Sequence, residues 1–184
     1  KKAKGVVIIV DIFRACSTAS YLLGNGVDKI IAVRTSKQAF ELKKKNPKYI
    51  LIGENRGIKI KGFDFGNSPT EINKFNLSGK TIVFRTSSGT QGIVCAKNAS
   101  EIILGSFTTA DATRNYLRKT NPKTVTIVCL GDSIRNRNSE DWLYADYLEN
   151  EIKGKKIVFD KIKNCIRKSK NARPFFDQFD LSSP

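Results

Sequence analysis

The stretch Gly5–Phe13, "GVVIIVDIF", places five apolar residues in a row, Val6–Val10, directly before the carboxylate of Asp11. A continuous apolar run of this length is typical of a strand that is buried on both faces, as in a parallel sheet covered by helices. A carboxylate at the end of such a strand risks burial and needs a partner. The stretch therefore predicts a buried strand and a functional role for Asp11.

Strand-like and helix-like segments alternate along the rest of the chain. Short apolar runs predict further strands at residues 27–33, 48–54, 79–86, 100–106 and 123–131. Amphipathic or small-residue segments predict helices at residues 14–26, 35–46, 87–99, 108–121, 139–154 and 155–170. This alternation predicts an α/β fold, a three-layer α/β/α arrangement around a mostly parallel or mixed sheet.

Two segments echo each other, at about residues 6–33 and 79–106. In each, an apolar strand leads to an arginine, Arg14 or Arg85, followed by a Ser/Thr-rich turn, a small-residue helix and an "-II-" strand. Chance similarity of two β-α-β units is the alternative explanation. We expect a single domain over residues 1–184, with a possible two-fold internal repeat whose two turns face one shared site. We also expect the natural chain to continue past "DLSSP".

The composition excludes several kinds of catalytic site. The 184 residues include no histidine, which rules out Ser-His-Asp and Cys-His catalysis and every His-ligated metal site. Any metal then needs oxygen ligands, which favours Mg²⁺ or Mn²⁺. The four cysteines lie far apart, which predicts free thiols in a reducing compartment. No apolar run approaches the ~20 residues of a membrane helix, so we expect a cytoplasmic protein without a membrane partner.

The net charge of +16 indicates an acidic partner or a solvated Lys-rich surface. The basic residues are spread along the whole chain, and no RNP motif, helix-turn-helix pattern or Arg-rich tail is present. We therefore favour the solvated surface and do not expect a nucleic-acid partner. A basic nucleic-acid-binding α/β module without catalysis remains an alternative.

Polar side chains gather where the predicted strands end, which is where ligands bind in open α/β sheets. They are Asp11, Arg14, Ser17, Glu54, Arg85, Thr86, Ser87, Ser88, Gly89, Thr90, Ser106, Gly131 and Asp132, with Glu140 and Asp141 at the start of a later helix. A Ser/Thr/Gly turn at a helix N-terminus offers N–H groups and hydroxyls to an oxyanion, arginine adds a planar donor fork, and carboxylates can hold Mg²⁺. The pattern predicts phosphoester chemistry. In the structural alternative, the Ser and Thr side chains only cap helices and the acidic side chains only stabilise a helix N-terminus.

A competing phosphatase pattern lies at "CLGDSIR", Cys129–Arg135. A cysteine five residues before an arginine, after a strand, is the bare pattern of cysteine-dependent phosphatases. Against this interpretation, Asp132 would place a carboxylate inside the phosphate cradle, and the next helix is expected to begin only near Ser139. Catalysis by Cys129 and Arg135 stays open as an alternative. A P-loop NTPase is excluded, because the chain has no G-x-x-x-x-G-K-[ST].

The segment "GENRGIKIKGFDFGNSPTE" resembles a signature of the 2-phosphosulfolactate phosphatase family. Further motifs of that family resemble "VDIFRACST", "RTSSGTQ", "GSFTTADA" and "CLG…SEDWLYAD", in the expected order along most of the chain. The chain departs from the family pattern at Ser88 and Thr109, where asparagine is expected, at Arg85, and after Gly131, where a second glycine is missing. These departures bear on the substrate more than on the fold.

The resemblance implies a Mg²⁺-dependent hydrolase that removes phosphate from 2-phosphosulfolactate or a related phosphorylated 2-hydroxy acid, a small anionic substrate, in coenzyme M biosynthesis. We predict catalytic roles for Asp11, Asp64 and Arg14. The predicted metal ligands are Asp11, Glu54 and Asp64, then Glu140 and Asp141. The predicted substrate-binding residues are Ser17, Asn67, Ser68, Arg85, Ser88, Gly89, Thr90 and Ser106, with Arg85 at the substrate carboxylate. The oligomeric state is left open, with a homodimer among the options.

Overall fold

The computed structural model describes residues 3–130, 139–155, 157–169 and 172. Its strands are β1 (Gly5–Val10), β2 (Lys29–Ala32), β3 (Ile50–Asn55), β4 (Ile58–Lys59), β5 (Thr81–Arg85), β6 (Ala99–Gly105) and β7 (Val125–Cys129). Its helices are α1 (Ala15–Gly24), α2 (Ser36–Lys45), α3 (Pro69–Ile72), α4 (Gly89–Cys95), α5 (Ala110–Thr120), α6 (Glu140–Ile152) and α7 (Phe159–Lys168), with a short 3₁₀ turn η1 (Phe107–Thr109).

The strands form two sheets, with the orders β6-β1-β7 and β2-β5-β3-β4. Every strand pair is parallel except β3 and β4, which form an antiparallel hairpin. β1 is the central strand of its sheet, and its five apolar residues, Val6–Val10, are all buried. The buried parallel strand that "GVVIIVDIF" predicts is therefore confirmed.

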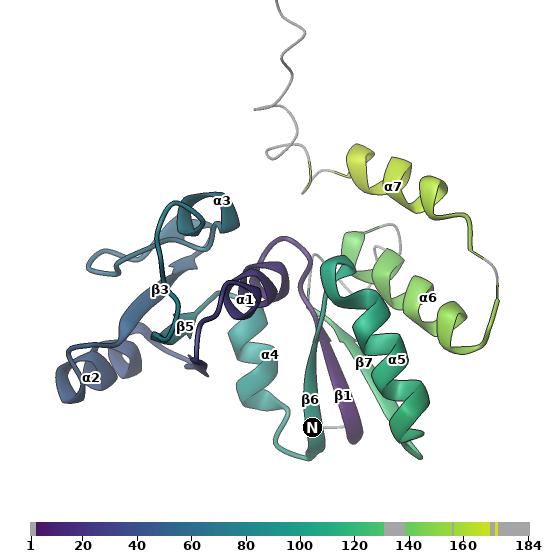
Figure 1. Ribbon diagram of the computed structural model, residues 1–184, viewed down its shortest axis with the longest axis horizontal. Helices are drawn as coiled ribbons and strands as arrows, with labels where there is room; N and C mark the ends of the chain where they lie inside the picture. The colour runs from purple at the N-terminus through teal and green to yellow at the C-terminus, as the bar shows by residue number, and fades with distance from the viewer. Residues whose placement is uncertain (1–2, 131–138, 156, 170–171, 173–184) are drawn as a thin grey trace, which may run out of the picture.

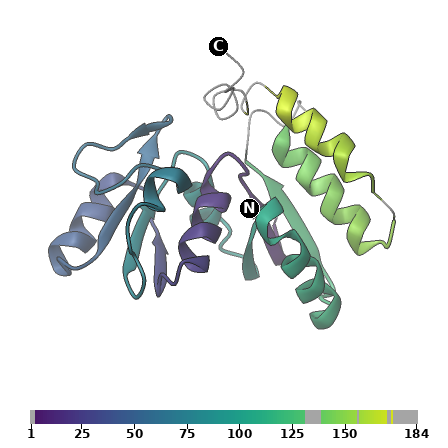
Figure 2. The ribbon, with the colours of Figure 1, turned by 45° about the horizontal axis from the view of Figure 1, so that its top comes forward.

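Each sheet is covered by helices on both faces, and the two sheets share one helical layer. The even-numbered residues of β1, Val6, Ile8 and Val10, pack against α5 and α6, whereas Val7 and Ile9 pack toward α1 and α4. In the second sheet one face packs on α1 and α3, and the other packs on α2. Figures 1 and 2 show α1 and α4 between the two sheets. The predicted α/β class is confirmed, although the strands are divided between two sheets.

The two halves of the chain exchange strands between these sheets. The order β1-α1-β2-α2-β3 is followed later by β5-α4-β6-α5-β7. β1 lies between β6 and β7 of the later segment, and β5 lies between β2 and β3 of the earlier one. Both crossover helices, α1 and α4, therefore begin near the middle of the molecule. The internal repeat itself stays a prediction.

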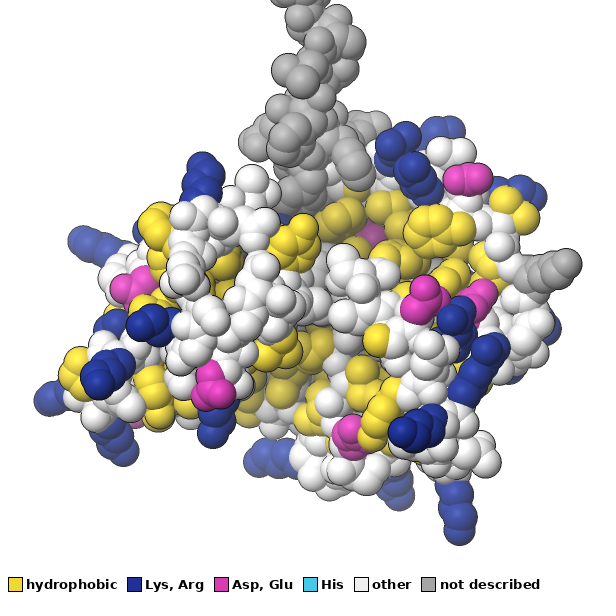
Figure 3. Space-filling view, in the orientation of Figure 1, with side chains coloured by type: hydrophobic (Ala, Val, Ile, Leu, Met, Phe, Trp, Pro, Cys, Tyr) yellow, Lys and Arg dark blue, Asp and Glu magenta, His cyan; other side chains and the backbone are white. Residues whose placement is uncertain are grey.

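The surface carries its positive charge in a dispersed way. On the face shown in Figure 3, lysine and arginine side chains lie around the periphery, over both sheets. Among the helices of the described ranges, none is long and apolar enough to cross a membrane. The distribution on this face agrees with the interpretation of the charge as a solvated surface.

Candidate active site

Two helix N-termini meet at the carboxylate of Asp11. Asp11 directly follows β1, and its Oδ1 atom accepts a hydrogen bond from the backbone N–H of Ala15, at the start of α1, at 3.1 Å. The backbone N–H of Gly89, at the start of α4, also donates to this carboxylate. Only 8% of Asp11 is exposed. Because a helix N-terminus carries partial positive charge, both helices stabilise negative charge at this point.

The close approach of the two helices depends on a glycine. A Cβ atom on Gly89 would overlap the Cβ of Ala15 and would lie 3.0 Å from Oδ2 of Asp11. The turn before α4 is fixed by two reciprocal hydrogen bonds, from Thr90 N to Thr86 Oγ1 at 3.0 Å and from Thr86 N to Thr90 Oγ1 at 2.9 Å. Thr86 was predicted among the polar side chains at this strand end, although no binding role was assigned to it.

Arg14 and several carboxylates surround Asp11. Burial raises the pKa of Asp11, and the negative charges of Glu54 and Glu140 add to this effect, while the two backbone N–H donors lower it. Burial lowers the pKa of Arg14, and the neighbouring carboxylates of Glu54, Asp11 and Glu71 counteract that shift. The sequence predicted Asp11, Arg14, Glu54 and Glu140 here. It missed Glu71, although Glu71 closes the "GFDFGNSPTE" part of the family signature.

Glu54 and Asp141 bind backbone N–H groups in two similar ways. Glu54 accepts from Ser87 N and from Gly57 N, each at 2.6 Å. Asp141 is 1% exposed and accepts from Ile12 N at 2.8 Å and from Leu130 N at 3.2 Å. Ile12 follows β1 by two residues, as Ser87 follows β5. Each carboxylate thus connects the turn after a central strand to the end of the neighbouring strand.

The structure does not gather the five predicted metal ligands into one cluster. In the described ranges, no three acidic or cysteine side chains are placed to hold one metal ion together. Asp64 accepts from Leu51 N at 2.7 Å and lies 3.5 Å from Lys43 Nζ. It therefore fastens its loop to β3 and α2, and its predicted catalytic and metal-binding roles stay predictions.

The predicted substrate-binding residues fall into separate groups. Ser17 and Ser106 are brought together, with their Oγ atoms 3.0 Å apart, and Ser106 also contacts Thr108 Oγ1 at 3.0 Å. Ser88 is the residue before α4, and Ser68 is the residue before α3. Asn67 is 6% exposed, and its Oδ1 atom has no hydrogen-bond partner in the described part of the chain. Their contacts with substrate stay predictions.

Residues 1–176 match the family model described as "2-phosphosulpholactate phosphatase". The chain belongs to this family. It is 32% identical over 177 residues to the "Probable 2-phosphosulfolactate phosphatase" of Bacillus subtilis (strain 168), a match that covers 92% of this chain and 74% of the relative. Proteins of the same description from Caldicellulosiruptor saccharolyticus and Carboxydothermus hydrogenoformans are 38% and 39% identical, over 76% and 77% of this chain. The chain spans 59% and 58% of the length of these two relatives.

The predicted resemblance to the 2-phosphosulfolactate phosphatase family is thereby confirmed. The motifs that carried it come together in space: "VDIFRACST" supplies Asp11 and Arg14, "RTSSGTQ" supplies the turn with Gly89, and "GSFTTADA" supplies Ser106 beside Ser17. The family is one of phosphoric monoester hydrolases, which agrees with the predicted phosphoester chemistry.

The alternative site in this phosphatase-family chain rests on Cys129 and Arg135. Burial, with the negative charges of Asp141 and Asp146, raises the pKa of Cys129 to about 12. A thiol in this environment stays protonated at neutral pH and is a poor nucleophile. Arg135 lies outside the described residues, as do Gly131 and Asp132. Among the described residues, the surroundings of Cys129 are therefore not the electropositive ones that a catalytic cysteine needs.

Proposed function

We propose that this chain is a phosphatase that hydrolyses 2-phosphosulfolactate or a related phosphorylated 2-hydroxy acid. The observation that carries the proposal is the carboxylate of Asp11 at the starts of α1 and α4, with Arg14 beside it. The two helix N-termini hold the Asp11 carboxylate in place, and the guanidinium of Arg14 is suited to hold a phosphoryl group and its developing charge. The names of the relatives and the family support the choice of substrate.

Within this proposal, the chain's own residues orient a compact polyanion. Arg14 would contact the phosphate oxygens through its planar donor fork. The hydroxyl of Ser106 and the amide N–H of Asn67 would donate to the sulfonate or carboxylate of the substrate. Ser17, whose hydroxyl donates to the carbonyl oxygen of Ile12, would position Ser106. Glu54 and Asp141 would act as positioning residues, because their oxygens already hold the turns that carry Ser87 and Ile12.

Mg²⁺ is part of the proposal and fits the charges of the site. The pKa of Asp11 is raised in part by Glu54 and Glu140, so a cation placed among these carboxylates would relieve their repulsion. Mg²⁺ commonly takes one or two protein carboxylates and completes its coordination with substrate phosphate and water, so a cluster of three is not required. Asp11, with Glu54 or Glu140, would hold it, since the negative charges of both glutamates raise the pKa of Asp11. When bound, the ion supplies positive charge that offsets the charge of the phosphoryl group.

The test measures phosphate release from 2-phosphosulfolactate and phospholactate, with Mg²⁺ and with EDTA. We expect activity that EDTA abolishes and that Asp11→Asn reduces by at least about a hundredfold, the usual scale for loss of a group that acts in the transition state. Asp28→Asn, at an exposed position after α1, is the matched control and should keep full activity. Full activity of Asp11→Asn, or no activity of the wild type on either substrate, would contradict the proposal.

The biological setting is a further part of the proposal. The proposal that this reaction is a step in coenzyme M biosynthesis rests on the family alone. A cytoplasmic location rests on the free thiols of Cys16, Cys95, Cys129 and Cys165, which suit a reducing compartment. A homodimer remains an expectation.

A further inference from the structure

A pocket of about 340 Å³ lies beside the second sheet, at the start of α2. Its lining residues are Ser36, Asn55, Ile58, Lys59, Ile60, Lys61 and Arg85. Three of these residues are basic, and none of the described residues that line it is acidic. A pocket of this volume is large enough for a small metabolite.

Arg85 is the group in this pocket that most needs an explanation. The residue is half-buried, and its Nη1 atom donates to the carbonyl oxygen of Glu54 at 2.6 Å and to Oδ1 of Asn55 at 3.3 Å. Both acceptors are neutral. No ion pair within the described ranges involves Arg85, and its buried Nε atom has no hydrogen-bond partner there. A partly buried guanidinium without a counter-charge is costly, and an anion would relieve that cost.

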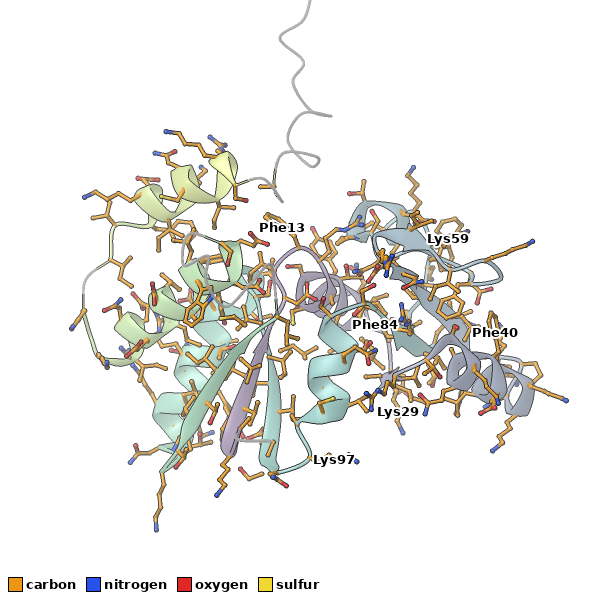
Figure 4. The ribbon with its side chains drawn as sticks, turned by 180° about the vertical axis from the view of Figure 1, so that it is seen from behind. Phe13, Lys29, Phe40, Lys59, Phe84 and Lys97 are labelled. Atoms are coloured by element: carbon orange, nitrogen blue, oxygen red, sulfur yellow. The ribbon has the colours of Figure 1, made fainter. Side chains whose placement is uncertain are left out.

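The pocket is separate from the site at Asp11. Side chains alternate between the two faces of a strand, so Arg85 shares a face with Val83 and lies opposite Phe84. Val83 packs in the apolar cluster under α2, whereas Phe84 packs in the cluster with α1. Figure 4 labels Lys59 over the second sheet and Phe13 at the end of β1, some way from it. Asp11 and Arg14 are not among the lining residues.

We propose that this pocket is a second anion-binding site, for a small metabolite that bears a phosphate, sulfonate or carboxylate group. Arg85 is its main contact. The amide of Asn55, the hydroxyl of Ser36 and the N-terminus of α2 assist, since a helix N-terminus favours negative charge. This assignment replaces the predicted role of Arg85 at the carboxylate of the substrate in the catalytic site, and it does not depend on the proposed hydrolysis.

The test is a titration of ¹⁵N-labelled protein with inorganic phosphate, sulfate and acetate in separate experiments, followed by amide NMR shifts. We expect saturable shifts at residues 36, 55, 58–61 and 85 for at least one of these anions. Arg85→Gln should weaken this binding by about tenfold or more, as expected for the loss of hydrogen bonds to a charged group. Arg14→Gln should leave it unchanged, because Arg14 belongs to the other site.

Two further variants keep the test independent of any folding defect in Arg85→Gln. Ile58 is 74% exposed at the pocket, so Ile58→Glu should fold normally and weaken binding by placing a negative charge there. Lys97→Gln, at an exposed position after α4, is the control for general surface charge and should have no effect. Shifts by phosphate and sulfate alone identify a tetrahedral oxyanion, and shifts by acetate alone identify a carboxylate. The absence of saturable shifts at these amides, or equal weakening by Lys97→Gln, would overturn the proposal.

Discussion

Gly89→Ala tests whether the close contact of α1 and α4 builds the site. The added Cβ would overlap the Cβ of Ala15, which cannot rotate away because it is fixed to the backbone of α1. It would also lie 3.0 Å from Asp11 Oδ2 and 3.3 Å from Thr86 Oγ1. Relief of the overlap therefore requires the two helix N-termini to separate, which displaces the Gly89 N–H from Asp11.

The expected cost follows from this geometry. Overpacking of a tight contact typically costs about 1–3 kcal/mol. For a chain of this size, a loss of about 2 kcal/mol corresponds to a decrease in Tm of roughly 4–8 °C. The change should also lower phosphatase activity, because Asp11 and the start of α4 would no longer share their present arrangement.

The assay is thermal unfolding by circular dichroism, together with phosphate release. Gly24→Ala is the matched control, because a Cβ at Gly24 meets nothing within 4 Å, and it should leave Tm unchanged or slightly raised. The double variant Ala15→Gly/Gly89→Ala removes the overlapping Cβ and should be more stable than the sum of the two single effects predicts. An unchanged Tm in Gly89→Ala, or strict additivity in the double variant, would refute the reasoning.

Three further predictions follow from the site. Burial raises the pKa of Asp11 in the folded protein above its ordinary value of 3.8, so the stability of the fold should fall as pH rises from 3.8 through that raised pKa. Asp11→Asn should remove this part of the pH dependence. Identical curves of Tm against pH for the two proteins would contradict the prediction. The two carboxylate oxygens of Asp141 each accept one backbone N–H group, and Asp141→Asn replaces one of these oxygens by an NH₂ donor. The free energy of unfolding should fall by about 2 kcal/mol, whereas the exposed control Asp146→Asn should leave it unchanged. Denaturant unfolding measures both. Cys129→Ser should retain activity, and wild-type Cys129 should resist alkylation at neutral pH, because its pKa is about 12; loss of activity in the variant would return the chemistry to this cysteine.

Local patterns predicted the elements well, because they depend on near neighbours. The apolar run Val6–Val10 needed no other segment to indicate a buried strand. The helix predicted at residues 35–46 is confirmed as α2, and the structure shows a capping box between Thr35 and Gln38 at its start. Asp11 was singled out because a carboxylate after such a strand needs partners, which the structure supplies at Ala15 and Gly89.

Residues whose contacts come from distant segments were harder to place. Asp64 was predicted as a catalytic and metal-binding residue, and those roles stay predictions. The structure shows that it accepts from Leu51 N and lies near Lys43, because its loop packs on β3 and α2. Glu54 and Asp141 were predicted as metal ligands, and that role stays a prediction; the structure shows that both accept backbone N–H groups. Nothing local to these carboxylates shows whether a metal ion or an N–H group is the partner.

The sequence by itself determined the α/β class, the family and the positions of Asp11, Arg14 and the Ser/Thr turns at strand ends. Apolar periodicity, caps and motif order are all written in contiguous residues. Only the tertiary structure decided that β1 pairs with β6 and β7, that β5 pairs with β2 and β3, and that α1 and α4 therefore start at one point. It also decided the face on which Arg85 lies. The pairing of strands and the face on which each side chain lies depend on how whole sheets bury their apolar surface. Every segment contributes to that burial, so no single stretch of sequence shows the outcome.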